Sequence, residues 1–464
     1  MDPDAKPVLV IGGGIAGMTA AVEVAEVGLP VILVEKDPFL GGRVMRSHKY
    51  FPKMCPPTCG FEINARRIRN NPRIEVKTLS TVEELDGSAG NFRARILTRP
   101  RYVTGKVSLD DALAEKLTGE RPDELNMGEG TTKALFYPHE AAYPPFHMLD
   151  RDALTEEDEG ILATAAPPDA IDLNMKEKEA WVDVGAVIVA TGWRPYDANN
   201  LENLAFGKAP NVITNVMMER LAAPTGHTGG KILRPSDGEA PGSVAFVQCA
   251  GSRDENHLPY CSAICCMASL KQARYLREQY PDCKVTLFYI DIRTVGRHED
   301  FYRDLLEDEN VTFIKGKVAG IAEVPGSQKL TLDVEDTIAG EKPEPEFDMV
   351  VLATGMVPNN LDSPIPLNME TDEYGFLDGA TDVDGIFAAG CGKNPCDVSQ
   401  SNKEATAAAL RAIQCLRRGG DHGRQDRRIH LHGLRDRRSP GHRCPAGGGH
   451  RGVQRSFLQD GGDL

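Results

Sequence analysis

Residues 7–35 read PVLVIGGGIAGMTAAVEVAEVGLPVILVE, which is the pattern of a β-strand, a glycine turn, a helix and a second β-strand. The apolar run VLVI ends at Gly12, and further glycines at positions 14 and 17 stand directly before the helix. In such a unit the first glycine permits the tight turn, the second lets backbone approach a pyrophosphate, and the third lets helix and strand pack closely. The stretch therefore predicts a Rossmann-type dinucleotide-binding unit.

The residues after this unit favour FAD as the dinucleotide. Glu35 ends the second strand, where a carboxylate suits a ribose hydroxyl and repels a 2′-phosphate. Gly41-Gly42-Arg43 resembles the stretch found at this point in flavoproteins of the glutathione-reductase type. An ordinary tight turn without a ligand is the alternative. The predicted FAD contacts are Gly12, Gly14, Ile15, Ala16, Gly17, Glu35, Lys36, Gly42, Arg43, Val82, Ala190, Thr191, Gly192, Gly390, Cys391 and Ser401.

A second, weaker strand–helix–strand pattern begins at Ser243, with SVAFVQ, ASLKQARYLREQY and KVTLFYID in order. Each unit is followed by the same phrase, VGAVIVATGWRP at 184–195 and DMVVLATGMVPN at 348–359. A phrase repeated at long spacing indicates duplicated domains. We therefore expect an α/β fold with two interleaved Rossmann-like domains of the FAD/NAD(P) disulfide-reductase type.

The domain boundaries follow from these patterns and from changes in composition. The expected FAD domain comprises 1–100, 181–225 and 360–416, an acidic, proline-rich insertion with one or two short helices covers 101–180, and the second domain covers 226–359. The insertion is expected to be a solvated cap or a docking segment. The Arg- and Gly-rich segment 417–464 lacks apolar periodicity and is expected to be disordered. A shifted reading frame in a GC-rich gene is the alternative explanation of its composition.

Where the second unit should carry its own glycine turn, the chain reads Cys249-Ala250-Gly251-Ser252-Arg253. Binding of a nicotinamide nucleotide there is therefore not expected. Three more cysteines follow closely, as Cys261-x-x-x-Cys265-Cys266. Four thiolates match the needs of a [4Fe–4S] cluster, one for each iron. The alternatives are a structural zinc ion, a disulfide, and thiols that only pack.

Other cysteines suggest two further features. Cys55-Pro-Pro-Thr-Cys59 follows the Gly42-Arg43 turn, where two thiols could cycle as a redox disulfide or belong to a rigid turn. We take Cys55 and Cys59 as candidate catalytic residues. In DGIFAAGC at 384–391, Cys391 stands where flavoproteins of this type carry an Asp for the ribityl chain. The helix expected from about Ser401 to Arg417 can still stabilise negative charge on a reduced flavin. Cys283, Cys415 and Cys444 are isolated and are expected to be packing thiols.

Composition excludes several classes of protein. A chain of 464 residues suggests about two or three domains. Its net charge of −15 disfavours nucleic acid as a partner, because phosphate binding needs a concentrated positive face. The N-terminus lacks the basic start of a signal peptide, and no apolar run is long enough to span a bilayer. We therefore expect a cytoplasmic protein whose contact with a membrane, if any, is made through a partner.

Taken together, these motifs resemble the heterodisulfide reductase A-like family. Within it, they resemble the A-type flavoprotein subunits of quinone-interacting membrane-bound oxidoreductases. The resemblance covers most of residues 7–416 and is most specific in QCAGSRDENHLPYCSAICC at 248–266. YIDIRTVG, LATGMVPN, GIFAAGC and FPKMCPPTCGFEINARRI also match.

The resemblance implies an FAD flavoprotein subunit, peripheral to the inner face of the membrane, with a [4Fe–4S] cluster on Cys249, Cys261, Cys265 and Cys266. It implies partners: a second flavin and iron–sulfur subunit, a membrane quinone-binding subunit, and adenylylsulfate reductase as the destination of electrons from menaquinol. Larger members carry ferredoxin-like cysteine motifs that are missing here, since no cysteine lies between Cys59 and Cys249 and the tail has no C-x-x-C. Electron bifurcation is therefore not expected.

Two other functions remain compatible with the residues. One is a stand-alone NAD(P)H-dependent flavoprotein disulfide oxidoreductase that acts through Cys55 and Cys59. The other is a scaffold subunit that keeps the fold without redox turnover.

Overall fold

The computed structural model describes residues 5–361, 369–377 and 384–418. The predicted disordered tail beyond residue 418, with Cys444, lies outside the described residues. Five clusters of buried apolar side chains form the interior. Two clusters belong to each of two sheets and one belongs to the insertion.

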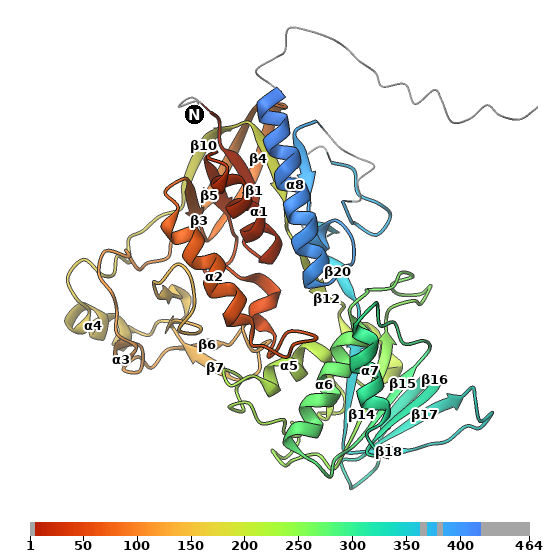
Figure 1. Ribbon diagram of the computed structural model, residues 1–464. Helices are drawn as coiled ribbons and strands as arrows, with labels where there is room; N and C mark the ends of the chain where they lie inside the picture. Colours follow the sequence, from red (N-terminus) through yellow and green to blue (C-terminus); the bar gives the residue numbers. More distant parts are fainter. Residues whose placement is uncertain (1–4, 362–368, 378–383, 419–464) are drawn as a thin grey trace, which may run out of the picture. The chain divides into compact units, whose positions relative to one another are not determined.

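The first sheet is five-stranded and parallel, in the order β21-β11-β1-β2-β3. All residues of β1, β2 and β11 are buried, as expected for a parallel sheet covered on both faces. Helices α1, α2 and α8 pack on one face (Figure 1), and the antiparallel sheet β10-β5-β4 packs on the other. These elements are β1 (Val8–Ile11), α1 (Ile15–Glu26), β2 (Val31–Val34), α2 (Pro57–Asn70), β3 (Ile74–Lys77), β4 (Ser80–Ser88), β5 (Asn91–Thr98), β10 (Lys178–Val184), β11 (Ala186–Val189), β21 (Ile386–Ala388) and α8 (Val398–Arg418).

The second sheet is seven-stranded, in the order β13-β19-β14-β15-β16-β17-β18. Its strands are parallel as far as β16, and β17 and β18 extend it in antiparallel fashion. Helices α5, α6 and α7 contribute to the cluster on one face (Figure 1). The elements are β13 (Val212–Thr214), α5 (Asn215–Ala222), β14 (Ser243–Ala250), α6 (Cys265–Gln279), β15 (Lys284–Tyr289), α7 (His298–Leu306), β16 (Val311–Glu323), β17 (Leu330–Asp336), β18 (Glu346–Phe347) and β19 (Met349–Thr354).

A short antiparallel ribbon joins the two sheets. It pairs β12 (Trp193–Pro195) with β20 (Met356–Pro358), and each strand directly follows one of the repeated Ala-Thr-Gly phrases. The ribbon is extended by hydrogen bonds from the Tyr196 N–H to the Gly355 carbonyl oxygen and from the Asn359 N–H to that of Gly192, at 2.8 and 3.2 Å. The repeat seen in the sequence thus marks the two points at which the chain leaves one sheet for the other.

The insertion has an apolar cluster of its own, which includes Leu113, Leu135 and Leu162. The acidic run EEDE starts α4, where Thr155 and Asp158 form a capping box. The insertion contains two short helices, where one or two were predicted, and two small ribbons, which the sequence pattern did not reveal. The elements are α3 (Asp111–Ala114), β6 (Glu120–Pro122), β7 (Thr131–Lys133), β8 (Leu135–Phe136), β9 (Met148–Leu149) and α4 (Glu156–Ala165).

The predicted fold class is confirmed by the two parallel sheets with their covering helices. Three details differ from the expectation. β13 falls in the range 181–225 expected for the FAD domain but is the edge strand of the second sheet, because it pairs with β19. α8 begins at Val398, before the expected start near Ser401. α6 begins at Cys265, before the expected Ala268, so two cysteines occupy its first turn. No helix in the described residues combines the length and apolarity needed to cross a bilayer.

Arg220 ties the insertion to the second sheet, and its removal should destabilise the chain. The side chain is only 2% exposed, and it donates to Asn126 Oδ1, Thr225 Oγ1 and the Arg46 carbonyl oxygen. Arg220→Ala leaves the buried Asn126 oxygen without this donor and removes the bonds to Thr225 and Arg46, so we expect a loss of about 2–3 kcal/mol, seen as a lower Tm. Replacement of the exposed Arg303 of α7 by Ala is the control. Equal Tm values for the two variants would contradict this account.

Candidate functional site

The first sheet gathers its glycines and its acidic residue at one edge. In a parallel sheet the carboxyl ends of all strands lie on the same side, where open α/β folds bind their ligands. Gly12 follows β1, Glu35 follows β2, Ala190 follows β11 and Gly390 closely follows β21. Predicted contacts separated by almost 380 positions along the chain therefore share this edge.

The glycines of the turn have distinct steric roles. A Cβ atom on Gly12 would lie 2.2 Å from the Ala190 oxygen, and one on Gly17 would lie 1.7 Å from the Gly12 oxygen. Those two positions require glycine for packing of the strands and helix. Gly14 differs, because the nearest atom to its Cβ would be 3.9 Å away and its φ of −75° is ordinary. Gly14 thus faces open space, which is what the approach of a pyrophosphate requires.

The start of α1 is free of competing groups. Gly14 is the N-cap and offers no side chain to the helix, and the first turn, with Ile15 and Ala16, contains no acidic residue. The first N–H groups of a helix lack intrahelical partners and carry its positive end. This helix start can therefore hold phosphate oxygens without displacing a side-chain cap.

Glu35 is buried at 7% exposure and is held by backbone. Its two carboxylate oxygens accept from the N–H groups of Gly13 and Asp37, at 2.6 and 2.9 Å. Burial, and then the charge of Asp37, raise the pKa of Glu35 to about 7. Burial beside the glycine turn therefore makes ionisation of this carboxylate unfavourable. A ribose hydroxyl that donates to the carboxylate would make its ionisation easier.

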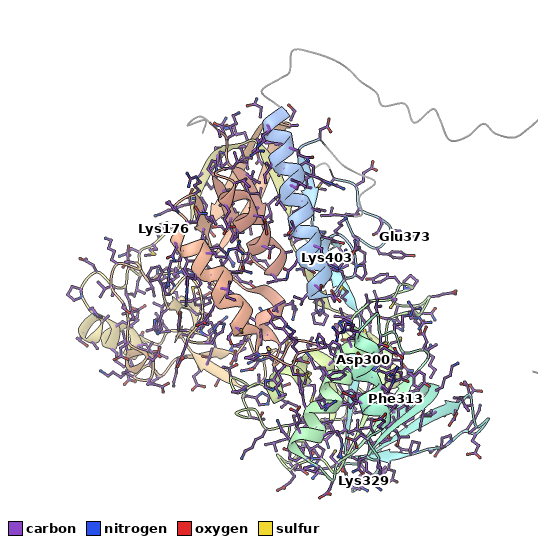
Figure 2. All side chains as sticks on the ribbon, in the orientation of Figure 1. Lys176, Asp300, Phe313, Lys329, Glu373 and Lys403 are labelled. Carbon is purple, nitrogen blue, oxygen red and sulfur yellow. The ribbon has the colours of Figure 1, made fainter. Side chains whose placement is uncertain are left out.

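The neighbouring predicted contacts take up different positions. Lys36 lies in the loop after Glu35, and its carbonyl oxygen accepts from Arg99 at 2.9 Å. Val82 is buried in β4, between the two sheets of this domain. An open hollow of about 440 Å³ adjoins this loop, with Leu79, Arg99 and Lys176, which is labelled in Figure 2, among its lining residues.

Residues around Trp193 close the other side of the edge. Gly42 lies against Gly14, with its Cβ position 3.0 Å from the Gly14 Cα. Arg43 donates to the Trp193 carbonyl oxygen at 3.3 Å and lies over its ring. Burial lowers the pKa of Arg43 to about 10. Gly192 has a φ of +71° with no atom near its Cβ position, while Thr191 donates to Asn360 Oδ1 at 2.7 Å.

Gly390, Cys391 and Ser401 lie together at the start of α8. The Gly390 N–H donates to Glu404 Oε2 at 3.1 Å, and a Cβ on Gly390 would lie 2.9 Å from the Ala16 Cβ. The chain here therefore packs directly against the first turn of α1. Cys391 has a sulfur neighbour that the sequence did not single out, Cys396, at 3.8 Å between the Sγ atoms.

The four clustered cysteines line one small cavity at the carboxyl edge of the second sheet. Cys249 ends β14, Cys265 donates to the carbonyl oxygen of Thr354 at the end of β19, and Cys266 donates to that of Asp291, just after β15. Cys261, from the loop before α6, completes the set. The structure therefore brings these predicted ligands to the edge where a Rossmann domain holds its nucleotide.

Burial and neighbouring thiols raise the pKa values of Cys249, Cys265 and Cys266. Burial, followed by the neighbouring thiol of Cys266, raises the pKa of Cys249 to about 11. Burial and the other three thiols hold the pKa of Cys265 well above its ordinary value. Such a group becomes fourfold ionised only when a cation compensates it, since like charges in a buried site oppose ionisation. The donor set therefore fits metal ions whose positive charge the four thiolates would compensate.

The backbone around the cavity is strained. Cys249, Arg253 and Ala263 all adopt positive φ values near +60°, a conformation that costs energy for residues other than glycine. The register between β14 and β19 also shifts next to Cys249. Strain concentrated in this way is typical of functional sites.

Arg253 and Arg293 line the same cavity, and the sequence did not single them out as site residues. Both pair with Asp291, Arg253 through Oδ1 and Arg293 through Oδ2 at 3.2 Å. The N–H of Ala263 also donates to the Cys261 sulfur at 3.4 Å. Positive side chains and an N–H donor around sulfur are suited to an anionic metal–sulfur centre. The only sequence signal was that both arginines fall in the motifs behind the family resemblance.

The sulfurs of the cavity do not converge on one point in the described residues. Within residues 5–361, 369–377 and 384–418, no three His, Cys, Asp or Glu side chains are placed to hold one ion. All cysteines of this part are free thiols. A cluster with one thiolate on each iron does not require the four sulfurs to meet at one ion, as zinc does. The free space is about 20 Å³, room for roughly one water, so a cluster requires the thiol side chains to rotate outward.

Cys55 and Cys59 lie at the surface. Cys55 precedes α2, Cys59 lies in its first turn, and both are exposed. Tyr50 lies beside them, and its pKa is raised to about 12 by burial and then by Cys59. Their redox role stays a prediction.

Comparisons with known proteins agree with this geometry. Residues 7–97 match the family model described as FAD dependent oxidoreductase. The chain is 37% identical over 424 residues to an A-type iron–sulfur subunit of the CoB–CoM heterodisulfide reductase of Methanopyrus kandleri, covering 89% of this chain and 64% of that protein. It is 36% identical over 419 residues to the A-type subunit of the H(2):CoB-CoM heterodisulfide,ferredoxin reductase of Methanothermobacter marburgensis, covering 87% and 63%.

The chain is thus similar over most of its own length to A-type subunits of heterodisulfide reductases. The resemblance expected from the sequence is confirmed at this level, and membership of the quinone-interacting group stays a prediction. The chain spans less than two thirds of the length of these relatives. Among solved structures, the thioredoxin reductase of T. acidophilum gives a TM-score of 0.47 at 14% identity, covering 88% of this chain and 98% of that one.

The open space at Gly14 predicts a variant that folds but binds nucleotide poorly. In Gly14→Ala the new methyl group meets no protein atom closer than 3.9 Å, yet it enters the space over the start of α1. We expect an unchanged Tm of the nucleotide-free chain and a loss of FAD affinity of about tenfold or more, measured by fluorescence titration. Gly17→Ala is the matched control and should instead lower the Tm, because its methyl group collides with Gly12. Undiminished FAD affinity in Gly14→Ala would rule out this phosphate site.

The raised pKa of Glu35 predicts a pH-dependent stability of the nucleotide-free chain. The folded state prefers the protonated acid. The contribution of Glu35 to the free energy of unfolding is therefore fully present below its ordinary pKa of 4.5 and is lost as the pH rises through about 7. Glu35→Gln carries no charge at any pH. We therefore expect its Tm, relative to wild type, to rise between pH 5 and pH 8. The exposed Glu115→Gln should show no such trend, and a constant difference for Glu35→Gln would contradict the burial argument.

Proposed function

We propose that this chain is an oxidoreductase subunit that binds FAD at the edge of the first sheet and a [4Fe–4S] cluster at the edge of the second. In this role it transfers electrons within a heterodisulfide-reductase-like complex. The observation that carries the proposal is the set of four cysteines at the carboxyl edge of the second sheet, where a nicotinamide nucleotide would otherwise bind.

Binding of NAD(P)H at that edge is disfavoured by the loop after β14. The loop reads Cys-Ala-Gly-Ser-Arg and offers no glycine pattern for a pyrophosphate. The first turn of α6 is occupied by Cys265 and Cys266, and Ile264 at its N-cap provides no side-chain cap. The unpaired N–H groups at this helix start favour thiolates, as they would favour a phosphate. The same structural element is thus adapted to sulfur ligands.

At the first edge the chain's residues bind and orient the nucleotide. The start of α1 would hold the pyrophosphate, Glu35 would accept from a ribose hydroxyl, and Gly192 would leave room beside the ring, against which Gly390 and Cys391 would lie. FAD takes up electrons in pairs and releases them singly, and an iron–sulfur cluster carries one electron at a time. The ribbon β12–β20 runs between the two edges and provides the direct protein path from one to the other.

The relatives' names describe heterodisulfide reductases, and we propose a more specific role for this chain. It receives electrons through a second flavin and iron–sulfur subunit from a membrane subunit that oxidises menaquinol, and it directs them towards adenylylsulfate reductase. It would then lie at the cytoplasmic face of the membrane through its partners. The support is the motif resemblance and the insertion, which has its own apolar cluster but no cysteine. An insertion without cysteine ligands favours a single path of electrons over a branched one.

Cys55 and Cys59 are proposed as an accessory redox pair of the same subunit. Their exposure at the start of α2 would let a partner protein or a small disulfide reach them.

Anaerobic purification with cysteine variants tests the assignment of the cluster. Wild type should contain flavin, iron and acid-labile sulfide, and Cys265→Ser should lose most of the iron while keeping the flavin, because one ligand is removed. Cys283→Ser is the matched control, since Cys283 is also a buried thiol but lies in the apolar core of the second sheet. Iron retained in Cys265→Ser at the level of Cys283→Ser would reject the site.

The choice of electron donor is tested on the same preparations. NADH and NADPH should leave the flavin absorbance of the isolated chain unchanged. A soluble menaquinol analogue should bleach it only when the quinol-oxidising membrane subunit is present. Rapid bleaching by NADH would favour the stand-alone disulfide oxidoreductase, and a chain without flavin would favour the scaffold.

A further inference from the structure

Two cysteines outside the four-cysteine cavity meet at the start of α8. Cys391 and Cys396 are five positions apart, and their Sγ atoms are 3.8 Å from each other. Both also contact the Ser401 hydroxyl, Cys396 at 3.2 Å and Cys391 at 3.8 Å. In a disulfide the two sulfur atoms are about 2.05 Å apart. Rotation of the two side chains can bring the Sγ atoms this much closer.

The two thiols differ in accessibility and in acidity. Cys391 is half-buried, whereas Cys396 is buried at 5% exposure. Hydrogen bonding by Cys396, and then by Ser401, lowers the pKa of Cys391, while the same pairing and burial raise that of Cys396. The pair therefore has a more accessible, more acidic thiol and a buried partner, the arrangement that favours attack by the first and resolution by the second.

The backbone around Cys391 permits this movement. Glycines flank it on both sides, and Gly390 has a φ of +67°. A Cβ on Gly392 would lie 2.7 Å from Thr191 Oγ1, so the loop packs against the edge of the first sheet. Both cysteines precede α8, whose first turn holds Ser401, so a bond between them closes within this loop and involves no residue of the helix.

We propose that Cys391 and Cys396 form a redox-active dithiol that reduces disulfide substrates and becomes an intramolecular disulfide. The Cys391 thiolate attacks one sulfur of a disulfide R–S–S–R, which forms a mixed disulfide and releases one thiolate. The Cys396 thiol then loses its proton and attacks the Cys391 sulfur, which closes the intramolecular bond and releases the second thiolate. Two thiols are oxidised, one disulfide is reduced to two thiols, and the reverse reaction with an external dithiol restores the pair.

The sequence between the two cysteines allows a direct assay. Lys393 is a trypsin site, so digestion separates Cys391 from Cys396 unless a disulfide links the two peptides. The full chain is equilibrated with mixtures of oxidised and reduced dithiothreitol, quenched with acid, alkylated, digested and analysed by mass spectrometry. We expect the linked peptides to accumulate as the mixture becomes more oxidising, with the dependence of a two-electron couple. Thiols that remain alkylatable across the whole range, or linkage of Cys391 to another cysteine, would overturn the proposal.

The order of the two steps is tested with variants and oxidised glutathione as the probe. Cys396→Ala removes the resolving thiol, so one glutathione should remain attached to Cys391, whereas Cys391→Ser should acquire none at Cys396. Cys415→Ser, in α8, is the matched control and should form the linked peptides as wild type does. An adduct on Cys396 instead of Cys391 would overturn the assigned roles. The wild-type measurement needs no variant and decides the case even where a substitution impairs folding.

Discussion

The parallel pairing of the strands is the constraint on which both sites depend. β1 pairs with β2 and β11, and β14 pairs with β15 and β19, all in the same direction. Parallel pairing gathers the ends of distant segments at one edge, so Glu35 shares an edge with residues that follow β21, and Cys249 comes near Asp291 and Thr354. Neither site exists as a continuous piece of sequence. Each is assembled by the sheet that supports it.

The two edges use comparable means to accommodate charge in a buried place. At the first, a carboxylate accepts two backbone N–H groups and is still difficult to ionise, because it is buried. At the second, burial and neighbouring thiols disfavour ionisation of Cys265, while two arginines pair with Asp291 beside the cysteines. At both edges, burial makes the ionised form of an acidic group, the Glu35 carboxyl or the Cys265 thiol, unfavourable in the protein alone, and a hydrogen-bond donor or a metal ion would stabilise that form. Such sites are organised before their ligands arrive, which is why their backbone and charges can be interpreted without them.

Local patterns predicted much of the first site and only part of the second. The spacing of glycines around β1 and α1 carries its own steric reasons, so Gly12 and Gly17 could be assigned their roles from sequence. The cysteine set could be predicted because thiols close in sequence suggested a shared centre. By contrast, β13 joins the second sheet through pairing with a strand more than 130 positions away, which no local pattern encodes. The positions of Arg253 and Arg293 in the cavity, and the contact of Cys391 with Cys396, depend on the conformation of loops, which the sequence pattern does not reveal.

Hydrogen bonds continue from one edge to the other through β20 and the residues after it. Ser262 and Tyr260, in the cysteine loop, bond to the backbone of Met356, while Asn360 accepts from Thr191 and donates to the Gly392 carbonyl oxygen. The Met356 bonds hold β20 against the cysteine loop, and the Asn360 bonds hold the second residue after β20 against the edge of the first sheet. The two candidate sites therefore share one short stretch of backbone, and each end of that stretch is bonded to a different site.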